Sequence, residues 1–236
     1  MDSELARMRE PRDSGIYTGT ALSALQAAQS RALLPALQRC AGSHGLLVSA
    51  GSGQLPPALP LLSHWTQLLV RGPCYAGDII AAIDEPLAFV DDAFDLIWLR
   101  HVLEVADDFS AVLHESVRVL AAGGTLVITG IHPISAWAPW YYWQERGARH
   151  GLHAPSRLAR NLRRSGLRVT GMQRVGSAWP RRAAPVPASP YPLGGGYVLL
   201  AQKQGTLVTP LRLRTESLHL PANGRLSPSA QRKLTA

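Results

Sequence analysis

FDLIWL at residues 94–99 is a nearly continuous apolar run, the pattern of a β-strand that is covered on both faces. Apolar side chains at helical spacing follow between 111 and 120, and TLVIT at 125–129 is a second apolar run of strand length. Gly123 and Gly124 are predicted to end the helix, because glycine accepts the left-handed backbone of a C-terminal cap. A strand, a crossover helix and a second strand make a parallel pair, so the sequence predicts an α/β sheet.

The wider segment 84–135 carries a set of motifs around this unit. LAFVDDAFDLIWLRHVLEV at 87–105 is followed by E..RVLAAGGTLVITG at 115–130 and then by HPIS at 132–135. These residues resemble the second half of the class I S-adenosylmethionine (SAM) dependent methyltransferases, and most closely the small type-11 group. The resemblance implies a Rossmann-like sheet of seven strands, mostly parallel with one antiparallel strand, and helices on both faces. It also implies SAM as the cofactor and methyl transfer as the activity.

Further elements are predicted outside this segment from the same patterns. They are a helix from Thr20 to about Arg39 with Thr20 as its cap, strands at 45–49, 65–70 and 78–83, a helix at 156–165 closed by Gly166, and an antiparallel pair of strands at 167–175 and 197–203. Asp95, at the start of the strand 94–99, is predicted to accept backbone hydrogen bonds there.

Length and composition fit one domain with short appendages. We expect a flexible N-terminus at 1–18, a methyltransferase-like domain at 19–203, and a basic, disordered tail at 204–236. The first residues are charged and lack the apolar core of a secretory signal, and no apolar run reaches the ~20 residues that span a bilayer. The expected location is therefore the cytoplasm. The two cysteines form no disulfide framework and no zinc spacing.

The net charge of +8 is distributed unevenly along the chain. From Arg146 onward there are sixteen Lys or Arg residues and one acid, Glu216. Such a region can meet RNA or another anionic surface, or it can be a solvated tail with no single partner. The sequence does not decide between these alternatives, and it gives no indication of the oligomeric state.

GLLVSAGSG at 45–53 predicts the first strand and a glycine turn. Glycine in such a turn lets backbone N–H groups approach a ligand closely, although the motif alone is as often an ordinary turn. The resemblance places Gly51 and Gly53 on two glycines of the SAM motif, with Ser52 between them. It places Ser49 where relatives usually carry an acid that helps hold the ammonium group of the cofactor.

The second and third strands contribute the other predicted cofactor contacts. Arg71 ends the second strand, where relatives usually carry an acid that pairs with the ribose hydroxyls. Asp84 and Glu85 follow the third strand and are candidates to accept the adenine amino group, or else they are solvent-facing turn residues. Two cofactor carboxylates are thus replaced, by Ser49 and by Arg71. The replacements motivate a second hypothesis, a non-catalytic binding module on the same fold.

His101 follows the strand 94–99 at its carboxyl end. Ligands of open α/β sheets bind beyond these ends, so His101 is predicted to face the cofactor and substrate mouth. A neutral histidine there can act as a general base, because it titrates near the working pH. The alternative is that His101 hydrogen-bonds a loop or lines the cofactor pocket.

The residues after the strand 125–129 are predicted to bind the acceptor. His132, a second candidate base, and Ser135 belong to the HPIS motif at another carboxyl end. Trp137 and Trp140 belong to a group of five aromatics in the seven residues 137–143. This group can be a lid over a flat or apolar acceptor, a helix packed on the sheet edge, or an amphipathic membrane contact.

The sequence therefore predicts a SAM-dependent methyltransferase that acts on a small or apolar acceptor of unknown identity. The alternatives are a catalytically degenerate module on the methyltransferase fold, and an RNA-directed methyltransferase that uses the basic C-terminal region.

Overall fold

The computed structural model describes residues 16–17, 19–51, 55–71, 74–83, 85–145, 151–180 and 192–205, all of which belong to one compact unit, Met1–Thr206. Its helices are α2 (Thr20–Leu37), the 3-10 turn η1 (Val102–Glu104), α3 (Phe109–Val119), α4 (Trp137–Gln144) and α5 (Pro155–Arg164). Its strands are β1 (Gly42–Ser49), β2 (Leu62–Arg71), β3 (Cys74–Gly77), β4 (Ala81–Ala82), β5 (Phe94–Arg100), β6 (Leu120–Ile131), β7 (Leu167–Val175) and β8 (Gly196–Lys203). The predicted flexible N-terminus and basic tail lie almost wholly outside the described residues.

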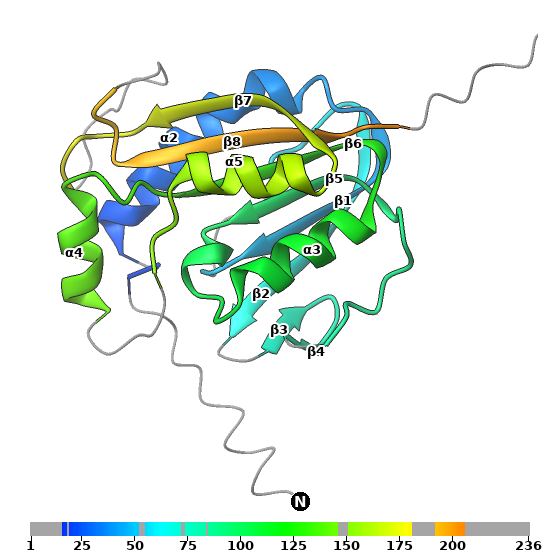
Figure 1. The fold of residues 1–236 in the computed structure, drawn as a ribbon, viewed down its shortest axis with the longest axis horizontal. Helices are drawn as coiled ribbons and strands as arrows, with labels where there is room; N and C mark the ends of the chain where they lie inside the picture. The colour runs from blue at the N-terminus through cyan, green and yellow to red at the C-terminus, as the bar shows by residue number, and fades with distance from the viewer. Residues whose placement is uncertain are drawn as a thin grey trace, which may run out of the picture. The chain divides into compact units, whose positions relative to one another are not determined.

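The strands form one mixed sheet with the order β4-β3-β2-β1-β5-β6-β8-β7 (Figure 1). Its centre, β2-β1-β5-β6, is parallel, while β8 runs antiparallel to both β6 and β7. The predicted α/β class and the antiparallel last pair are confirmed, although the described sheet has eight strands where seven are expected.

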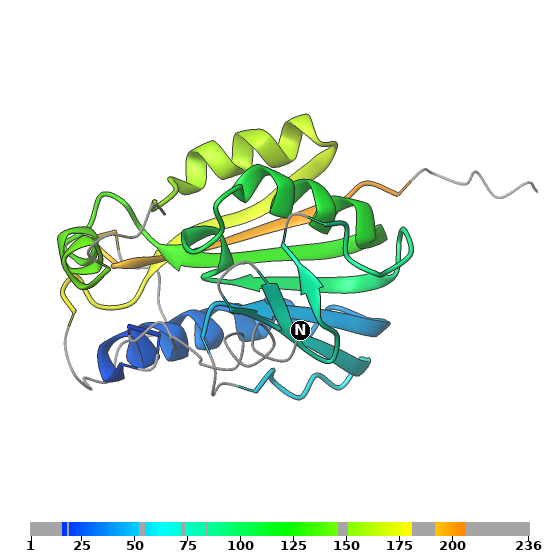
Figure 2. The ribbon, with the colours of Figure 1, turned by 90° about the horizontal axis from the view of Figure 1, so that it is seen from below.

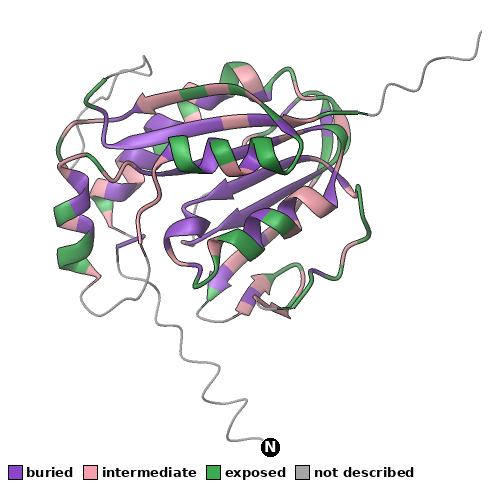
Figure 3. Ribbon diagram, viewed as in Figure 1, coloured by how far each residue is buried: buried purple, intermediate pink, exposed green. Residues whose placement is uncertain are grey.

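Helices cover both faces of the sheet, with α2 on one side and α3 and α5 on the other (Figures 1 and 2). The side chains of β5 alternate between two apolar clusters. Leu96 and Trp98 pack in the cluster that contains α2, while Ile97 and Leu99 pack in the cluster that contains α3 and α5. All four are at most 1% exposed, and Figure 3 shows most of the length of the central strands buried. The continuous apolar run that predicted this strand reflects burial on both faces.

Of the predicted strand at 78–83 only Ala81 and Ala82 are a strand, the short β4. Only two residues separate β2 from Cys74, which is too few for a crossover, so the chain can return only as an antiparallel hairpin. The hairpin consists of β3, which pairs with β2, and the short β4, which pairs with β3. The Asp78 carboxylate accepts the N–H of Gln67 at 2.7 Å and closes the turn where β3 ends.

The connection from β1 to β2 is short as well. Its described residues, 50–51 and 55–61, contain no helix and include three prolines. Leu59 is buried in the α2-side cluster, so an extended segment covers part of this face.

Two smaller predictions are also wrong. Gly123 and Gly124 lie inside β6, because the helix before them ends at Val119 and the strand begins at once. The N-cap of α2 is Gly19 rather than Thr20, and no side chain caps this end. The predicted helix at 156–165 is present as α5.

Asp95 has its predicted architectural role. Its carboxylate accepts the backbone N–H groups of Ser43 and His44, at 2.7 and 3.2 Å, and so fixes the start of β1 against β5. A carboxylate that accepts two amides stabilises the fold more than a neutral acceptor does.

We predict that Asp95→Ala lowers the free energy of unfolding by about 1–3 kcal/mol, because two amides lose their charged acceptor. Asp95→Asn, which keeps one acceptor oxygen, is the matched control and should lose less. Urea denaturation measures both variants. An alanine variant as stable as the unaltered protein would contradict this role.

Candidate functional site

The predicted site lies at the carboxyl ends of β1 and β5. The chain continues from β1 to β2 on one side, whereas β5 joins β1 on the other, so the strand order reverses between them. Ligands of open α/β sheets bind at such a switch point. The N–H of Ala50 donates to the carbonyl of Arg100 at 3.1 Å. The turn that begins at Ser49 and the segment that leads to His101 are therefore adjacent, as the sequence predicts.

His101 does not face an open mouth. Its side chain is fully buried, and its backbone is left-handed with φ 58°. Nδ1 lies 2.9 Å from Oε2 of Glu104, and Nε2 lies 2.9 Å from Oε1 of Gln29. Both ring nitrogens are thus occupied by the protein, which leaves neither available as a general base in this arrangement.

The partners of the ring define its protonation. Gln29 uses its amide Nε2 to donate to the carbonyl of Gly130 at 2.9 Å, so its oxygen must face the imidazole. The Glu104 carboxylate is an acceptor as well. With Glu104 ionised, both ring nitrogens of His101 donate, and the ring is then the imidazolium form. His101 and Glu104 form a buried ion pair.

Glu104 is the centre of a wider polar cluster, which we call the Glu104 cluster and define as Tyr17, Gln29, His101, Glu104, Tyr141 and Tyr197. Its carboxylate, 1% exposed, accepts the hydroxyl of Tyr17 at 3.2 Å and the N–H of Ile131. Its backbone carbonyl accepts the hydroxyl of Tyr141 at 3.0 Å. The cluster joins the N-terminal segment, α2, η1, the end of β6, α4 and β8.

The three tyrosines of the cluster are neutral, and Tyr17 and Tyr141 donate to Glu104. Burial, and after it the Glu104 charge, raises the pKa of Tyr17, Tyr141 and Tyr197 well above the ordinary value. Gly130 leaves room for the cluster, since a Cβ there would lie 2.7 Å from both the Glu104 carboxylate and the Tyr197 hydroxyl.

The glycine turn is closed by the chain itself. The Ser49 hydroxyl donates to the carbonyl of Gly51 at 2.9 Å, and the Ser49 side chain is buried. A Cβ on Gly51 would lie 2.5 Å from the Cβ of Tyr17, so the backbone space that glycine provides is filled by Tyr17. Ser52 and Gly53 lie outside the described residues.

Of the remaining predicted cofactor residues, Arg71 ends β2 at the same edge of the sheet, because β2 runs parallel to β1. Arg71 and Glu85 are exposed, and Asp84 lies outside the described residues. Beside Ser49 in the β1–β5 register lies Arg100, which is 2% exposed. Its guanidinium carbon is 4.2 Å from the centre of the Trp98 ring. Burial lowers the pKa of Arg100 to about 10, so the group stays charged at neutral pH.

His132 and Ser135 lie together at the carboxyl end of β6. Nδ1 of His132 accepts the N–H of Ile134 at 3.1 Å, and the Ser135 hydroxyl donates to the His132 carbonyl at 2.6 Å. Burial, and next the nearby Arg174, lowers the pKa of His132, so the ring is neutral at pH 7. Because Nδ1 accepts, the proton lies on Nε2, and His132 presents a hydrogen-bond donor rather than a base.

The two tryptophans that are predicted to bind the methyl acceptor differ in their exposure. Trp137 is 1% exposed, and its Nε1 donates to the carbonyl of Ser177 at 2.9 Å. Trp140 is partly exposed and packs edge-on against Trp137, with 5.5 Å between ring centres. The aromatic run is thus the helix α4, whose buried Trp137 and Tyr141 pack with apolar side chains of the N-terminal segment, of α2 and of the end of β6.

Sequence reasoning missed the Glu104 cluster because its members come from distant segments. Two features of the sequence do indicate buried polar residues that need partners. Gln29 lies among alanines and leucines on the buried face of α2, and Glu104 follows His101-Val102-Leu103, where a buried polar residue needs a partner.

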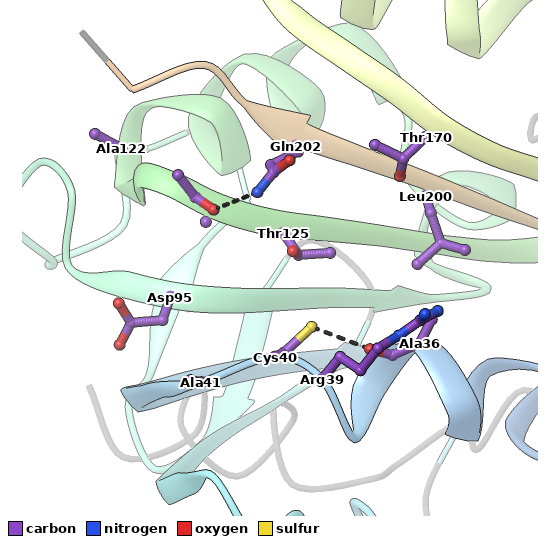
Figure 4. A pocket seen from close by; sticks show the side chains of 12 residues that line it. Ala36, Arg39, Cys40, Ala41, Asp95, Ala122, Thr125, Thr170, Leu200 and Gln202 are labelled. Carbon is purple, nitrogen blue, oxygen red and sulfur yellow. Dashed lines mark hydrogen bonds between the residues drawn. The ribbon is translucent and has the colours of Figure 1, made fainter. Parts of the chain in front are cut away.

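A hollow of about 470 Å³ lies at the opposite end of the sheet (Figure 4). Its lining includes Arg39, Cys40, Asp95, Thr125 and Gln202, near the amino ends of β1 and β5. The Cys40 thiol donates to the carbonyl of Ala36 at 3.5 Å, and burial raises its pKa. The hollow is separate from the switch point. No group of three or more His, Cys, Asp or Glu side chains among the described residues could hold a metal ion.

Comparison with known proteins identifies the fold. The chain is similar to a SAM-dependent methyltransferase, possible histamine N-methyltransferase, from Thermotoga maritima, with TM-score 0.56 and 16% identity over 78% of this chain and 92% of that chain. It is similar to a SAM dependent methyltransferase from Archaeoglobus fulgidus, with TM-score 0.50 and 12% identity over 76% of this chain and 94% of that one. It is also similar to the methyltransferase CalH in complex with SAH, with TM-score 0.51 and 16% identity over 76% of this chain and 57% of that one.

The sheet, its switch point and these similarities define a class I SAM-dependent methyltransferase fold. Residues 66–128 match the family model described as methyltransferase domain, of the type-11 group, which confirms the resemblance over the central part of the chain. No curated protein matches the chain by sequence. No described helix is long and apolar enough to cross a membrane.

We predict that Glu104→Gln lowers the free energy of unfolding by about 3–5 kcal/mol, because it leaves the buried His101 imidazolium without its counter-charge. Glu145→Gln, at the partly exposed end of α4, is the matched control and should change stability by less than about 0.5 kcal/mol. Chemical denaturation measures both. A Glu104→Gln variant that unfolds like the control would mean that His101 is not charged.

Proposed function

We propose that this protein is a SAM-dependent methyltransferase that acts on a small or apolar acceptor. The observation that supports it is the adjacency of the Ser49–Gly51 turn and the end of β5 at the switch point of a type-11 methyltransferase fold. Bound SAM supplies a methyl group already activated on a sulfonium, so the protein has to align the reactants and exclude water.

The described residues fit SAM only in part. The turn stands at the correct edge of the sheet, but Tyr17 fills the space above Gly51. Neither Ser49 nor Arg71 can supply the carboxylates that relatives direct at the ammonium group and the ribose. Binding therefore requires a shift of the segment Ile16–Tyr17, which is held there by the Tyr17–Glu104 hydrogen bond and by apolar packing.

The hydrogen-bonding states of His101 and His132 restrict the kind of methyl acceptor that the protein can use. His101 is a charged donor inside the fold, and His132 presents Nε2–H when its Nδ1 accepts from Ile134. His101 and His132 are the two predicted bases. Neither has a ring nitrogen available to take a proton at this end of the sheet. The acceptors that this geometry favours are therefore those that arrive already nucleophilic, such as a carboxylate, a phenolate or an unprotonated amine, with His132 as a hydrogen-bond donor to them.

A second candidate is a non-catalytic module on the same fold. The observation that favours it is the filling of the predicted cofactor space by the protein itself, through Tyr17 and the Glu104 cluster. The RNA-directed alternative depends on the basic second half of the chain and stays a prediction.

Titration calorimetry with SAM and with its demethylated product separates the two candidates. The methyltransferase proposal predicts saturable binding of both ligands to the full-length protein. No heat and no thermal shift at millimolar ligand would contradict it and would favour the module. Gly51→Arg is a poor probe, because any side chain there collides first with Tyr17.

We predict that Arg71→Glu strengthens SAM binding roughly tenfold, because it places a carboxylate where relatives pair with the ribose hydroxyls and removes a positive charge near a cationic ligand. Arg71 is exposed, so the fold should tolerate the change. Arg31→Glu, an identical charge change on the exposed side of α2, is the matched control. Calorimetry measures both. Equal affinities in the two variants would contradict the position assigned to the ribose.

A further inference from the structure

The outer side of α5 carries a concentrated positive charge. We call it the α5 face and define it as Arg157, Arg160, Arg163 and Arg164, all of which are exposed. The four side chains leave the helix within about one third of its circumference, on the side away from the buried leucines of α5. The helix contains no acid, so the whole of its outer side is cationic.

The charge of the α5 face is not neutralised by its surroundings. Within the described part of the chain, none of its four arginines forms an ion pair. The acids of the neighbouring α3 segment have other roles. Asp108 accepts two backbone N–H groups at the start of α3, and Glu115 is paired with Arg118 on another side of that helix.

This placement of charge is unfavourable for α5 itself. Arg160 stands three residues from Arg157 and Arg163 and four residues from Arg164, and like charges at these spacings on a helix repel. The helix dipole favours the two arginines of the last turn, but it disfavours Arg157, which stands in the first turn. The stability of α5 therefore does not explain its arginines, whereas an anionic partner would.

A groove of about 220 Å³ lies between α3 and α5, beside the α5 face. Figure 1 shows the two helices on the same side of the sheet. Ser110 and His114 line the groove from α3, while Asn161, Arg164 and Ser165 line it from α5 and its C-cap. The hydroxyl and amide side chains among them can both donate and accept hydrogen bonds.

One end of the α5 face lies near the candidate site. The guanidinium carbon of Arg157 is 5.4 Å from the centre of the Phe109 ring, and this ring packs on His153 with 4.1 Å between ring centres. Phe109 is the first residue of α3, which starts soon after η1 at the carboxyl end of β5. A polymer that follows the α5 face can therefore reach the carboxyl edge of the sheet.

We propose that the α5 face and the adjoining groove bind the phosphate backbone of single-stranded RNA. The guanidinium group binds phosphate through two parallel hydrogen bonds, and all four cations of the face are arginine. From Arg157 to Arg164 the helix rises about 10 Å, a length along which one strand carries about three phosphates. The hydroxyl and amide groups of the groove match the ribose 2′-hydroxyl, which also donates and accepts.

A lipid surface fits the α5 face less well. No large apolar side chain is exposed on α3 or α5, and a helix at a membrane interface needs such side chains to insert. Because the proposed contacts go to phosphate and ribose, we expect binding without a preference for base sequence.

Fluorescence anisotropy with a labelled oligouridylate, which forms no base pairs with itself, tests the proposal on the full-length protein. We expect saturable binding whose logarithmic affinity falls linearly with the logarithm of the salt concentration. The assay contains no SAM, so its outcome is independent of the methyltransferase proposal.

Arg160→Gln combined with Arg164→Gln should weaken RNA binding by about tenfold and reduce the salt slope by about one to two, because two phosphate contacts are lost. Arg31→Gln combined with Arg39→Gln removes the same charge from exposed positions at α2 and should change the affinity less than about twofold. Both variants should keep the thermal midpoint of the unaltered protein, since all four side chains are exposed.

Three outcomes would overturn the proposal. Absence of salt-sensitive binding to the oligouridylate would exclude RNA as the partner. Equal affinities and salt slopes in the two double variants would assign RNA binding to the net charge of the chain rather than to the α5 face. Binding to phosphatidylglycerol vesicles that the Arg160 and Arg164 variant loses, without RNA binding, would assign the face to lipid.

Discussion

The buried ion pair of His101 and Glu104 constrains the whole carboxyl edge of the sheet. Taking both charges out of water is costly, and their attraction offsets this cost only if the geometry is good and the remaining polar atoms are satisfied. Here they are: Gln29 accepts from the other ring nitrogen, and Tyr17 and the Ile131 amide donate to the carboxylate. Any arrangement that separates these groups leaves a buried charge unpaired. The ion pair therefore holds η1, α2, the N-terminal segment and the end of β6 in their positions relative to one another.

The same constraint changes how the candidate site is understood. Open α/β sheets bind their ligands at the switch point, and in this protein the polar groups of the Glu104 cluster, which lie there, are committed to each other. Tyr17 both donates to Glu104 and covers Gly51, which links the N-terminal segment to the state of the glycine turn. Cofactor access and the integrity of the Glu104 cluster are therefore coupled. A ligand that displaces Tyr17 must offset the loss of a hydrogen bond to a charged acceptor.

Much of the fold could be predicted because burial on two faces leaves a visible pattern. The apolar run at 94–99 predicted the central strand β5, and the helical spacing of apolar residues at 111–120 predicted α3. The hairpin of β3 and β4 could not be predicted from the apolar pattern of 78–83, because its cause is the two-residue connection after Arg71 rather than side-chain periodicity. The position of His101 at a strand end was predicted correctly, whereas its burial depends on Gln29, 72 residues earlier, and no local pattern shows that contact.

The protonation of His101 tests this account most directly. In protein labelled with nitrogen-15 at histidine, the spectrum at about pH 7.5, where an ordinary histidine is mostly neutral, should show protons on both ring nitrogens of His101. The assignment follows from loss of the signal in His101→Gln. One protonated and one bare nitrogen would contradict the account, since His101 would then be neutral and would form no ion pair with Glu104.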